Sequence, residues 1–197
     1  MDEGLRERKK RETRAAISLV ATRLFYERGF DAVTVDEVAR AAGVSKMTVF
    51  NYFARKEDLM LDREAEGLAL LRTALAGRGQ KSVITALREE VSRLVAEDNV
   101  FTRFDAGVLG FWDVVDASAT LRARLHELAD EAREMITAEL EGPNAELVGG
   151  IVAIGWRAAY RAGLSAARRG KSPAKAAAEL ERVLDAAVAA ARAALRH

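Results

Sequence analysis

The 197-residue sequence predicts an all-α protein of about nine helices, with a small N-terminal domain and a larger C-terminal domain. Three observations support this fold class. Apolar residues recur at helical spacing along most of the chain, and no stretch alternates as a half-buried strand would. Half of the residues are hydrophobic and only 2 are proline, as expected of long packed helices. Breaks that contain glycine, at residues 77–79 and 142–144, separate the helical stretches.

Residues 34–56 predict two short helices joined by a tight turn. Thr34 and Glu37 have the spacing of a capping box, which begins the first helix. Gly43 ends that helix, because glycine adopts the left-handed conformation at low cost. Ser45 is a good N-cap for the second helix, whose apolar positions again share one face. This spacing is typical of a helix-turn-helix, in which the second helix enters the major groove of DNA.

An ordinary helical hairpin would explain the apolar positions of this segment equally well. It would not explain why the second helix exposes polar and flexible side chains and is followed by cations. Those residues are Lys46, Met47, Thr48, Asn51, Arg55 and Lys56. We therefore favour a DNA-binding interpretation, with residues 1–56 as the binding domain and 57–197 as a second domain.

The distribution of charge agrees with this interpretation. Residues 1–56 carry 12 basic and 8 acidic residues, whereas the rest of the chain carries 19 and 22. Residues 1–9 are expected to form a disordered arm, since blocks of charge are commonly solvated. The cations from Lys10 to Arg14 are expected to contact phosphates, because neutralised phosphates release counterions and raise affinity.

Residues from about 10 to 60 resemble the DNA-binding domain of TetR-type repressors. The family pattern is an apolar helix ending in LFxxxGF, followed by TVxxIAxxAGVSxGTxYxYFxxKExL. The chain matches it at Leu24, Phe25, Gly29, Phe30, Thr34, Val35, Ala39, Ala42, Gly43, Val44, Ser45, Thr48, Tyr52, Phe53, Lys56, Glu57 and Leu59. It departs at Met47, where the family usually has glycine, and at Phe50, where it usually has tyrosine. These departures affect the choice of operator sequence more than DNA binding itself.

The resemblance and the exposed positions together give the expected DNA-binding residues. They are Thr34, Ser45, Lys46, Met47, Thr48, Asn51, Tyr52 and Lys56. We expect five of them to hold phosphates, namely Thr34, Lys46, Thr48, Tyr52 and Lys56. Met47 and Asn51 are expected to face base edges, where asparagine can pair with adenine through two hydrogen bonds.

The remaining helices follow from periodicity and caps. We expect a first helix over about 7–28, a fourth over 57–75 that links the two domains, and a fifth that begins near Ser82. A less regular stretch covers 100–115. Long helices are then expected over about 121–141 and 145–168, and a last one that begins with Ser172 as its cap and Pro173 in its first turn.

The helix over 145–168 is apolar on two opposite faces. Leu147, Ile151, Ile154 and Ala158 share one face, and Val152, Trp156, Tyr160 and Gly163 share the other. Such a helix needs cover on both sides, from its own chain or from a second copy. The resemblance favours a homodimer through the last two helices, with small residues such as Gly149, Gly150 and Gly155 permitting close approach.

Aromatic residues gather in two parts of the second domain and are interrupted by aspartates. We expect them to line a ligand pocket, because apolar walls with few polar groups are typical of ligand sites. The residues are Phe101, Phe104, Phe111, Trp112, Trp156 and Tyr160. The alternative is that they are plain core. The resemblance implies a small apolar inducer in this region. The stretch from Thr120 to Arg124 and the terminal helices resemble family members with acyl-CoA-like ligands.

The sequence offers little for catalysis. It has no cysteine and only 2 histidines, and His126 and Asp130 lack a third metal ligand. We find no catalytic triad, paired carboxylates or intact phosphate-binding loop. We therefore expect no enzyme activity, no metal and no cofactor. No apolar stretch is long enough for a membrane span, and we expect a cytoplasmic protein.

The sequence thus predicts a homodimeric regulator that binds a palindromic operator in double-stranded DNA and is released by a small hydrophobic ligand. Two alternatives remain open. The same DNA-binding domain could serve an activator or a regulator that responds to no ligand. The second domain could instead make the protein a binding module for small molecules or proteins.

Overall fold

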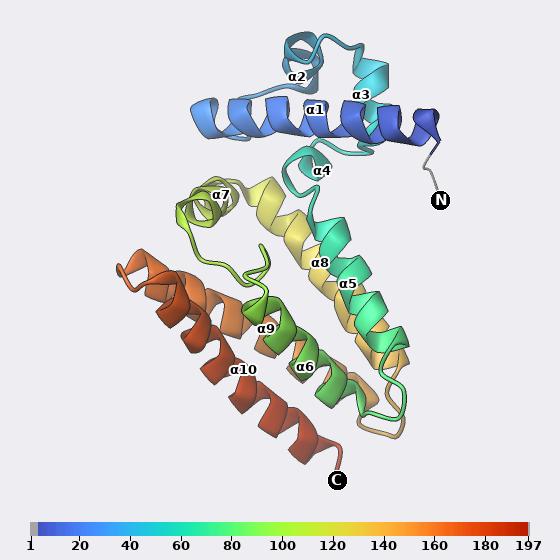
Figure 1. Ribbon diagram of the computed structural model, residues 1–197, viewed down its shortest axis with the longest axis vertical. Coiled ribbons are helices and arrows are strands. Elements are labelled where there is room, and N and C mark those ends of the chain that lie inside the picture. Colours follow the sequence, from blue (N-terminus) through green and yellow to red (C-terminus); the bar gives the residue numbers. More distant parts are fainter. Residues whose placement is uncertain (1–3, 197) are drawn as a thin grey trace. The chain divides into compact units, whose positions relative to one another are not determined.

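The computed structural model describes residues 4–196, apart from the side chains of residues 64 and 65. Within that part every helix is an α-helix, and no strand is present. This confirms the all-α prediction. In chain order the helices are α1 (Leu5–Arg28), α2 (Val35–Ala41), α3 (Lys46–Tyr52), α4 (Glu57–Met60), α5 (Glu64–Ala76), α6 (Val83–Ala96), α7 (Ala106–Ala117), α8 (Ala119–Ala138), α9 (Ala145–Arg168) and α10 (Pro173–Ala194) (Figure 1).

The chain divides into two compact units. The first, called the head below, contains the residues up to 65 together with 110–124. The second, called the body, contains 66–109 and the residues from 125 onward. The head is therefore built from two separate stretches of sequence, and it is larger than the domain of residues 1–56 that the sequence predicts.

The head has its own apolar core. Its fully buried side chains include Ile17, Phe25, Val33, Val38, Val49, Phe53 and Leu59, between α1 and α4, together with Val115 of α7 and Leu121 of α8. Helix α1 begins at Leu5, within the stretch 1–9 that the sequence predicts as a disordered arm, and residues 1–3 lie outside the described part. Arginine, lysine and glutamate favour helices, and Glu7 lies in the first turn, where a carboxylate suits the helix dipole.

The predicted linking helix over 57–75 is interrupted. Its start forms the short α4, and α5 begins only at Glu64. Leu59, Met60 and Leu61 are all buried, although they are consecutive. Successive residues of an α-helix point about 100° apart, so a helix packed on one side cannot bury three in a row. The chain therefore leaves the helix here, which accounts for a tenth helix.

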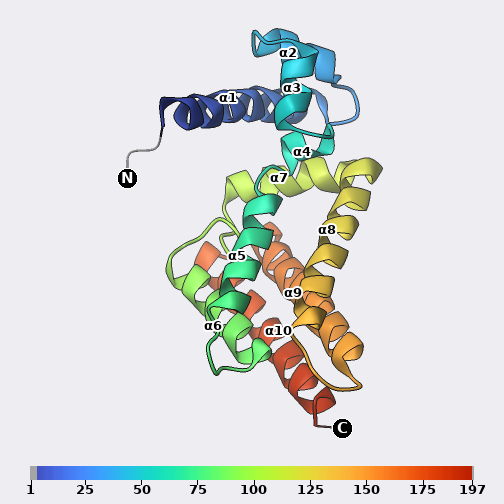
Figure 2. The same cartoon turned by 90° about the vertical axis from the view of Figure 1, so that its right-hand side faces the viewer.

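In the body, α9 and α10 run side by side in both views (Figure 1 and Figure 2). A Cβ atom on Gly155 would lie 2.3 Å from that of Ala187, so the glycine allows this close packing. Gly149 likewise faces Thr137 of α8. Both glycines therefore serve packing within the chain. The predicted caps Ser82 and Ser172 are confirmed, since each side-chain oxygen accepts a hydrogen bond from an amide three residues on.

No helix within residues 4–196 combines the length and the apolar character that crossing a membrane requires.

Candidate nucleic-acid interface

Helix α2 begins with a complete capping box. The Thr34 hydroxyl accepts a hydrogen bond from the Glu37 amide at 3.2 Å, and the Thr34 amide donates to Glu37 Oε2 at 2.8 Å. Gly43 then has a φ of 68°, in the left-handed region that favours glycine. The turn between α2 and α3 therefore forms as the sequence predicts, and it fixes the start of the second helix.

Helix α3 is capped by Ser45, whose Oγ accepts a hydrogen bond from the Thr48 amide at 3.0 Å. The hydroxyls of Ser45 and Thr48 also lie 2.8 Å apart and hydrogen-bond to each other. Both hydroxyls are exposed at the amino end of the helix. They can donate hydrogen bonds to the phosphate oxygens of DNA there.

The outer face of α3 presents side chains rather than burying them. Met47 is 69% exposed and Phe50 is 41% exposed, and Asn51 lies beside them one turn after Met47. On the opposite face, Val49 is fully buried. The sequence correctly indicates Met47 and Asn51 as exposed positions. Phe50, which departs from the family pattern, belongs to the same exposed face.

Lys46 lies at the start of α3 and forms an ion pair with Asp36 of α2, with Nζ and Oδ2 2.7 Å apart. Both side chains are about half exposed. Exposed pairs of this kind contribute little free energy, so a phosphate can replace the carboxylate at low cost. Lys46 is therefore available for the phosphate contact that the sequence predicts.

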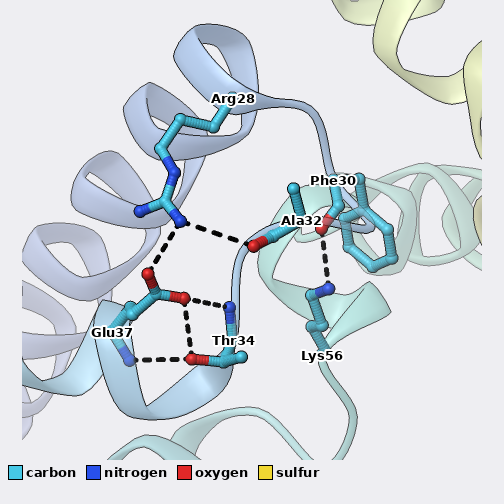
Figure 3. Close-up of polar contacts among 6 residues, drawn as sticks. All are labelled: Arg28, Phe30, Ala32, Thr34, Glu37 and Lys56. Carbon is cyan, nitrogen blue, oxygen red and sulfur yellow. Dashed lines mark hydrogen bonds and ion pairs between the residues drawn. The ribbon is translucent and has the colours of Figure 1, made fainter.

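Two other predicted phosphate contacts have different partners. The Lys56 ammonium is directed inward and donates to the backbone oxygen of Phe30 at 2.7 Å (Figure 3). The backbone oxygen of Tyr52 accepts a hydrogen bond from Arg14, and its side chain is half-buried. Arg14, which the sequence places in a phosphate-contacting stretch, also pairs with Asp62. Lys56 and Arg14 therefore both have partners within the head.

The corner between α1 and α2 contains a second cation. Arg28 donates to Glu37 Oε1 at 2.8 Å and to the backbone oxygen of Ala32 at 3.4 Å (Figure 3). The Thr34 amide, Arg28 and the Thr34 hydroxyl together lower the pKa of Glu37 to about 2. Glu37 is therefore ionised at any ordinary pH, and it joins the end of α1 to the start of α2.

The six aromatic residues predicted to line a pocket fall in both units. In the body, the rings of Phe104 and Tyr160 lie 5.2 Å apart, and those of Tyr160 and Trp156 lie 5.9 Å apart. Phe101 packs on Gly67. Phe111 and Trp112 belong to the head and contact each other edge to face at 5.6 Å.

The body also has an open groove of about 460 Å³ on α8 and α9. It is lined by His126, Ile154, Arg157, Ala158 and Arg161. None of the six predicted aromatic residues lines this groove, because they lie on other faces of α9, on α7 or in the turn before α7. Among the described residues, no group of three side chains is arranged to hold a metal ion.

The two short helices, their caps and the exposed face of α3 define a protein of the helix-turn-helix class. Residues 17–62 match the family model of the bacterial regulatory proteins of the tetR family. Over this segment the chain is therefore similar to the regulators of the TetR family.

Two curated relatives each match a short part of the chain. TcmR of Streptomyces glaucescens, an HTH-type transcriptional regulator, is 41% identical over 58 residues, which are 29% of this chain and 26% of TcmR. YdeS of Bacillus subtilis, an uncharacterised HTH-type transcriptional regulator, is 44% identical over 50 residues, 25% of each chain. The chain thus spans about a quarter of the length of the curated relatives it matches.

The fold is similar beyond that segment. NalD of Pseudomonas aeruginosa, the secondary repressor of the MexAB-OprM multidrug efflux pump, is 18% identical with a TM-score of 0.55. The likeness covers 91% of this chain and 97% of that one. At this identity the likeness shows that the body shares the fold, and it assigns no ligand to the body.

Proposed function

We propose that the protein is a sequence-specific DNA-binding transcriptional regulator that acts as a repressor. The observation that carries this proposal is the outer face of α3. Met47, Phe50 and Asn51 are exposed there, and Lys46 begins the same helix with a weakly held ammonium. A capped helix with such a face fits the major groove, with Asn51 and Met47 at base edges and Lys46, Thr48 and Thr34 at phosphates.

The regulator acts as a homodimer that joins through α9 and α10. Leu147 is 57% exposed and Ile154 is 63% exposed on one face of α9, and Ala158 is exposed between them and the helix end. The opposite face, with Val152 and Gly163, packs within the body. A second copy would cover the exposed face. Two recognition helices related by a two-fold axis read an inverted repeat.

A small apolar ligand bound in the body releases the operator. The rings of Phe104, Tyr160 and Trp156, which pack tilted against one another, support a largely apolar site, and Phe101 adds to its wall. An acyl-CoA-like compound is one candidate class. A ligand that binds one conformation of the body better than another lowers operator affinity by that difference in binding free energy.

A gel shift with duplex DNA from upstream of the protein's own coding region tests DNA binding. The proposal expects a shifted band at modest salt that fades steeply as salt rises, because counterions are released on binding. A protein that shifts neither this duplex nor any duplex selected from a random pool would contradict it.

Two other functions use the same parts differently. An activator, or a regulator without a ligand, would also shift the duplex, and transcription from the bound promoter separates it from a repressor. A binding module for small molecules or proteins would shift no duplex. The exposed face of α3 favours DNA binding over that module.

A further inference from the structure

The carboxyl end of α3 is held by a lysine that follows it. Lys56 Nζ donates to the backbone oxygen of Phe30, in the corner between α1 and α2, at 2.7 Å (Figure 3). The same ammonium lies 4.2 Å from the centre of the Phe30 ring and 5.9 Å from that of Phe25. Such positions over a ring face attract a cation. Lys56 is thus bound to the corner through its charge, and burial lowers the pKa of its ammonium.

A second cation holds the same end from α1. The Arg14 guanidinium lies 4.3 Å from the centre of the Phe53 ring. It donates to the backbone oxygen of Tyr52, in the last turn of α3, and forms an ion pair with Asp62. The last carbonyls of a helix lack partners within it, and a cation there also suits the helix dipole. Arg14 therefore acts as the carboxyl-terminal cap of the recognition helix.

These two contacts place α3 relative to the rest of the head. Phe53, just after α3, is fully buried, and Arg14 and Lys56 fix the backbone on either side of it. Turning the Lys56 ammonium outward to a phosphate would leave the Phe30 oxygen only the longer hydrogen bond from the Val33 amide, at 3.3 Å, and would remove the charge from both rings. The loss of the shorter hydrogen bond and of the two ring contacts favours the inward position.

We propose that Lys56 and Arg14 are positioning residues that set the angle of the recognition helix, and that neither contacts a phosphate. The proposal rests on the DNA-binding function proposed above. Correct angle matters most where α3 meets base edges, since those hydrogen bonds require alignment, whereas phosphate contacts tolerate small rotations. Losing either cation should therefore weaken the selected operator more than an unrelated duplex.

The test compares Lys56→Met with Lys46→Met. Methionine keeps the length and apolar stem of lysine but removes the charge and the donor. Each folded variant is titrated by fluorescence anisotropy with the duplex that the wild type selects and with a scrambled duplex, at several salt concentrations. Circular dichroism checks that the variant is folded at the temperature used.

For Lys56→Met we expect the operator preference to fall by about tenfold, which corresponds to the loss of one good base contact. The slope of log affinity against log salt should stay that of the wild type. For Lys46→Met, a phosphate contact, both duplexes should weaken alike, and the slope should shrink by about 0.9. Equal weakening and a smaller slope for Lys56→Met would overturn the proposal, as would a preference that does not change.

A measurement on the wild type avoids any folding defect of the variant. Reductive methylation of lysines, read by mass spectrometry with and without the selected duplex, reports which ammonium groups the DNA covers. Lys46 should become protected only in the complex, whereas Lys56 should be equally slow in both samples. Protection of Lys56 that needs DNA would overturn the assignment. If the wild type selects no duplex, the proposed DNA-binding function itself is contradicted.

Discussion

At the scale of single residues, Glu37 makes the clearest prediction about pH. Its pKa is lowered to about 2 by hydrogen bonds from the Thr34 amide, Arg28 and the Thr34 hydroxyl. The unfolded carboxyl titrates near 4.3, so the stabilisation is complete above that pH and is lost as pH falls toward 2. The melting temperature of the wild type should therefore fall more steeply over this window than that of Glu37→Gln.

Thermal melts by circular dichroism from pH 7 to pH 2 measure the difference between the two proteins. The gap should be largest near neutral pH and should close at the acid end. Glu27→Gln is a matched control, because that exposed carboxylate contacts only Arg23 at 4.0 Å. A gap that stays constant with pH would show that Glu37 stabilises the head by packing and not by charge.

Single residues also show which roles can be predicted from the sequence. Thr34, Gly43 and Ser45 act through neighbours a few positions away, so their roles follow from local spacing alone. Lys56 bonds to Phe30 and Arg14 to Tyr52, residues that are remote in sequence and adjacent only after folding. From sequence alone, a cation beside a helix-turn-helix is indistinguishable from a phosphate contact, so the sequence could not predict these contacts within the head.

At the scale of helices, Ser118 joins two distant stretches of the head. It is buried, its Oγ donates to Asp31 Oδ1 at 2.9 Å, and it accepts from the Leu121 amide at the start of α8. Ser118→Ala should cost about 1–2 kcal/mol of unfolding free energy, through the lost cap and hydrogen bond.

Urea denaturation of wild type, Ser118→Ala, Asp31→Ala and the double variant tests this link. The two single losses should overlap, so that the double variant costs less than their sum. Strictly additive losses would mean that the two side chains do not act together.

Helix boundaries illustrate the limit of periodicity. Helix α9 spans 145–168 as the sequence predicts, because the glycines at 142 and 170 break the chain on either side of a continuous apolar pattern. The break between α4 and α5 could not be predicted, since leucines continue at helical spacing through it. It arises because the head buries Leu59, Met60 and Leu61 together, which is a property of tertiary packing.

At the scale of the whole molecule, the exposed face of α9 predicts how copies associate. Ile154→Glu should weaken the proposed dimer by at least about tenfold, because the interface would lose an apolar side chain and bury a charge in its place. Size-exclusion chromatography with light scattering at micromolar concentration reports the mass. Leu19→Glu, at an apolar position of α1 that is 73% exposed, is the control and should keep the mass of the wild type. A dimer that survives Ile154→Glu would place the interface elsewhere.

The central claim is that α3 reads DNA sequence, and selection from a random duplex pool tests it most directly. Wild type and Asn51→Ala are each incubated with the pool at modest salt, and the retained duplexes are sequenced. We predict that wild type enriches an inverted repeat and that Asn51→Ala relaxes the preference at one position in each half-site. Retention of no duplex, or identical preferences for the two proteins, would contradict the account.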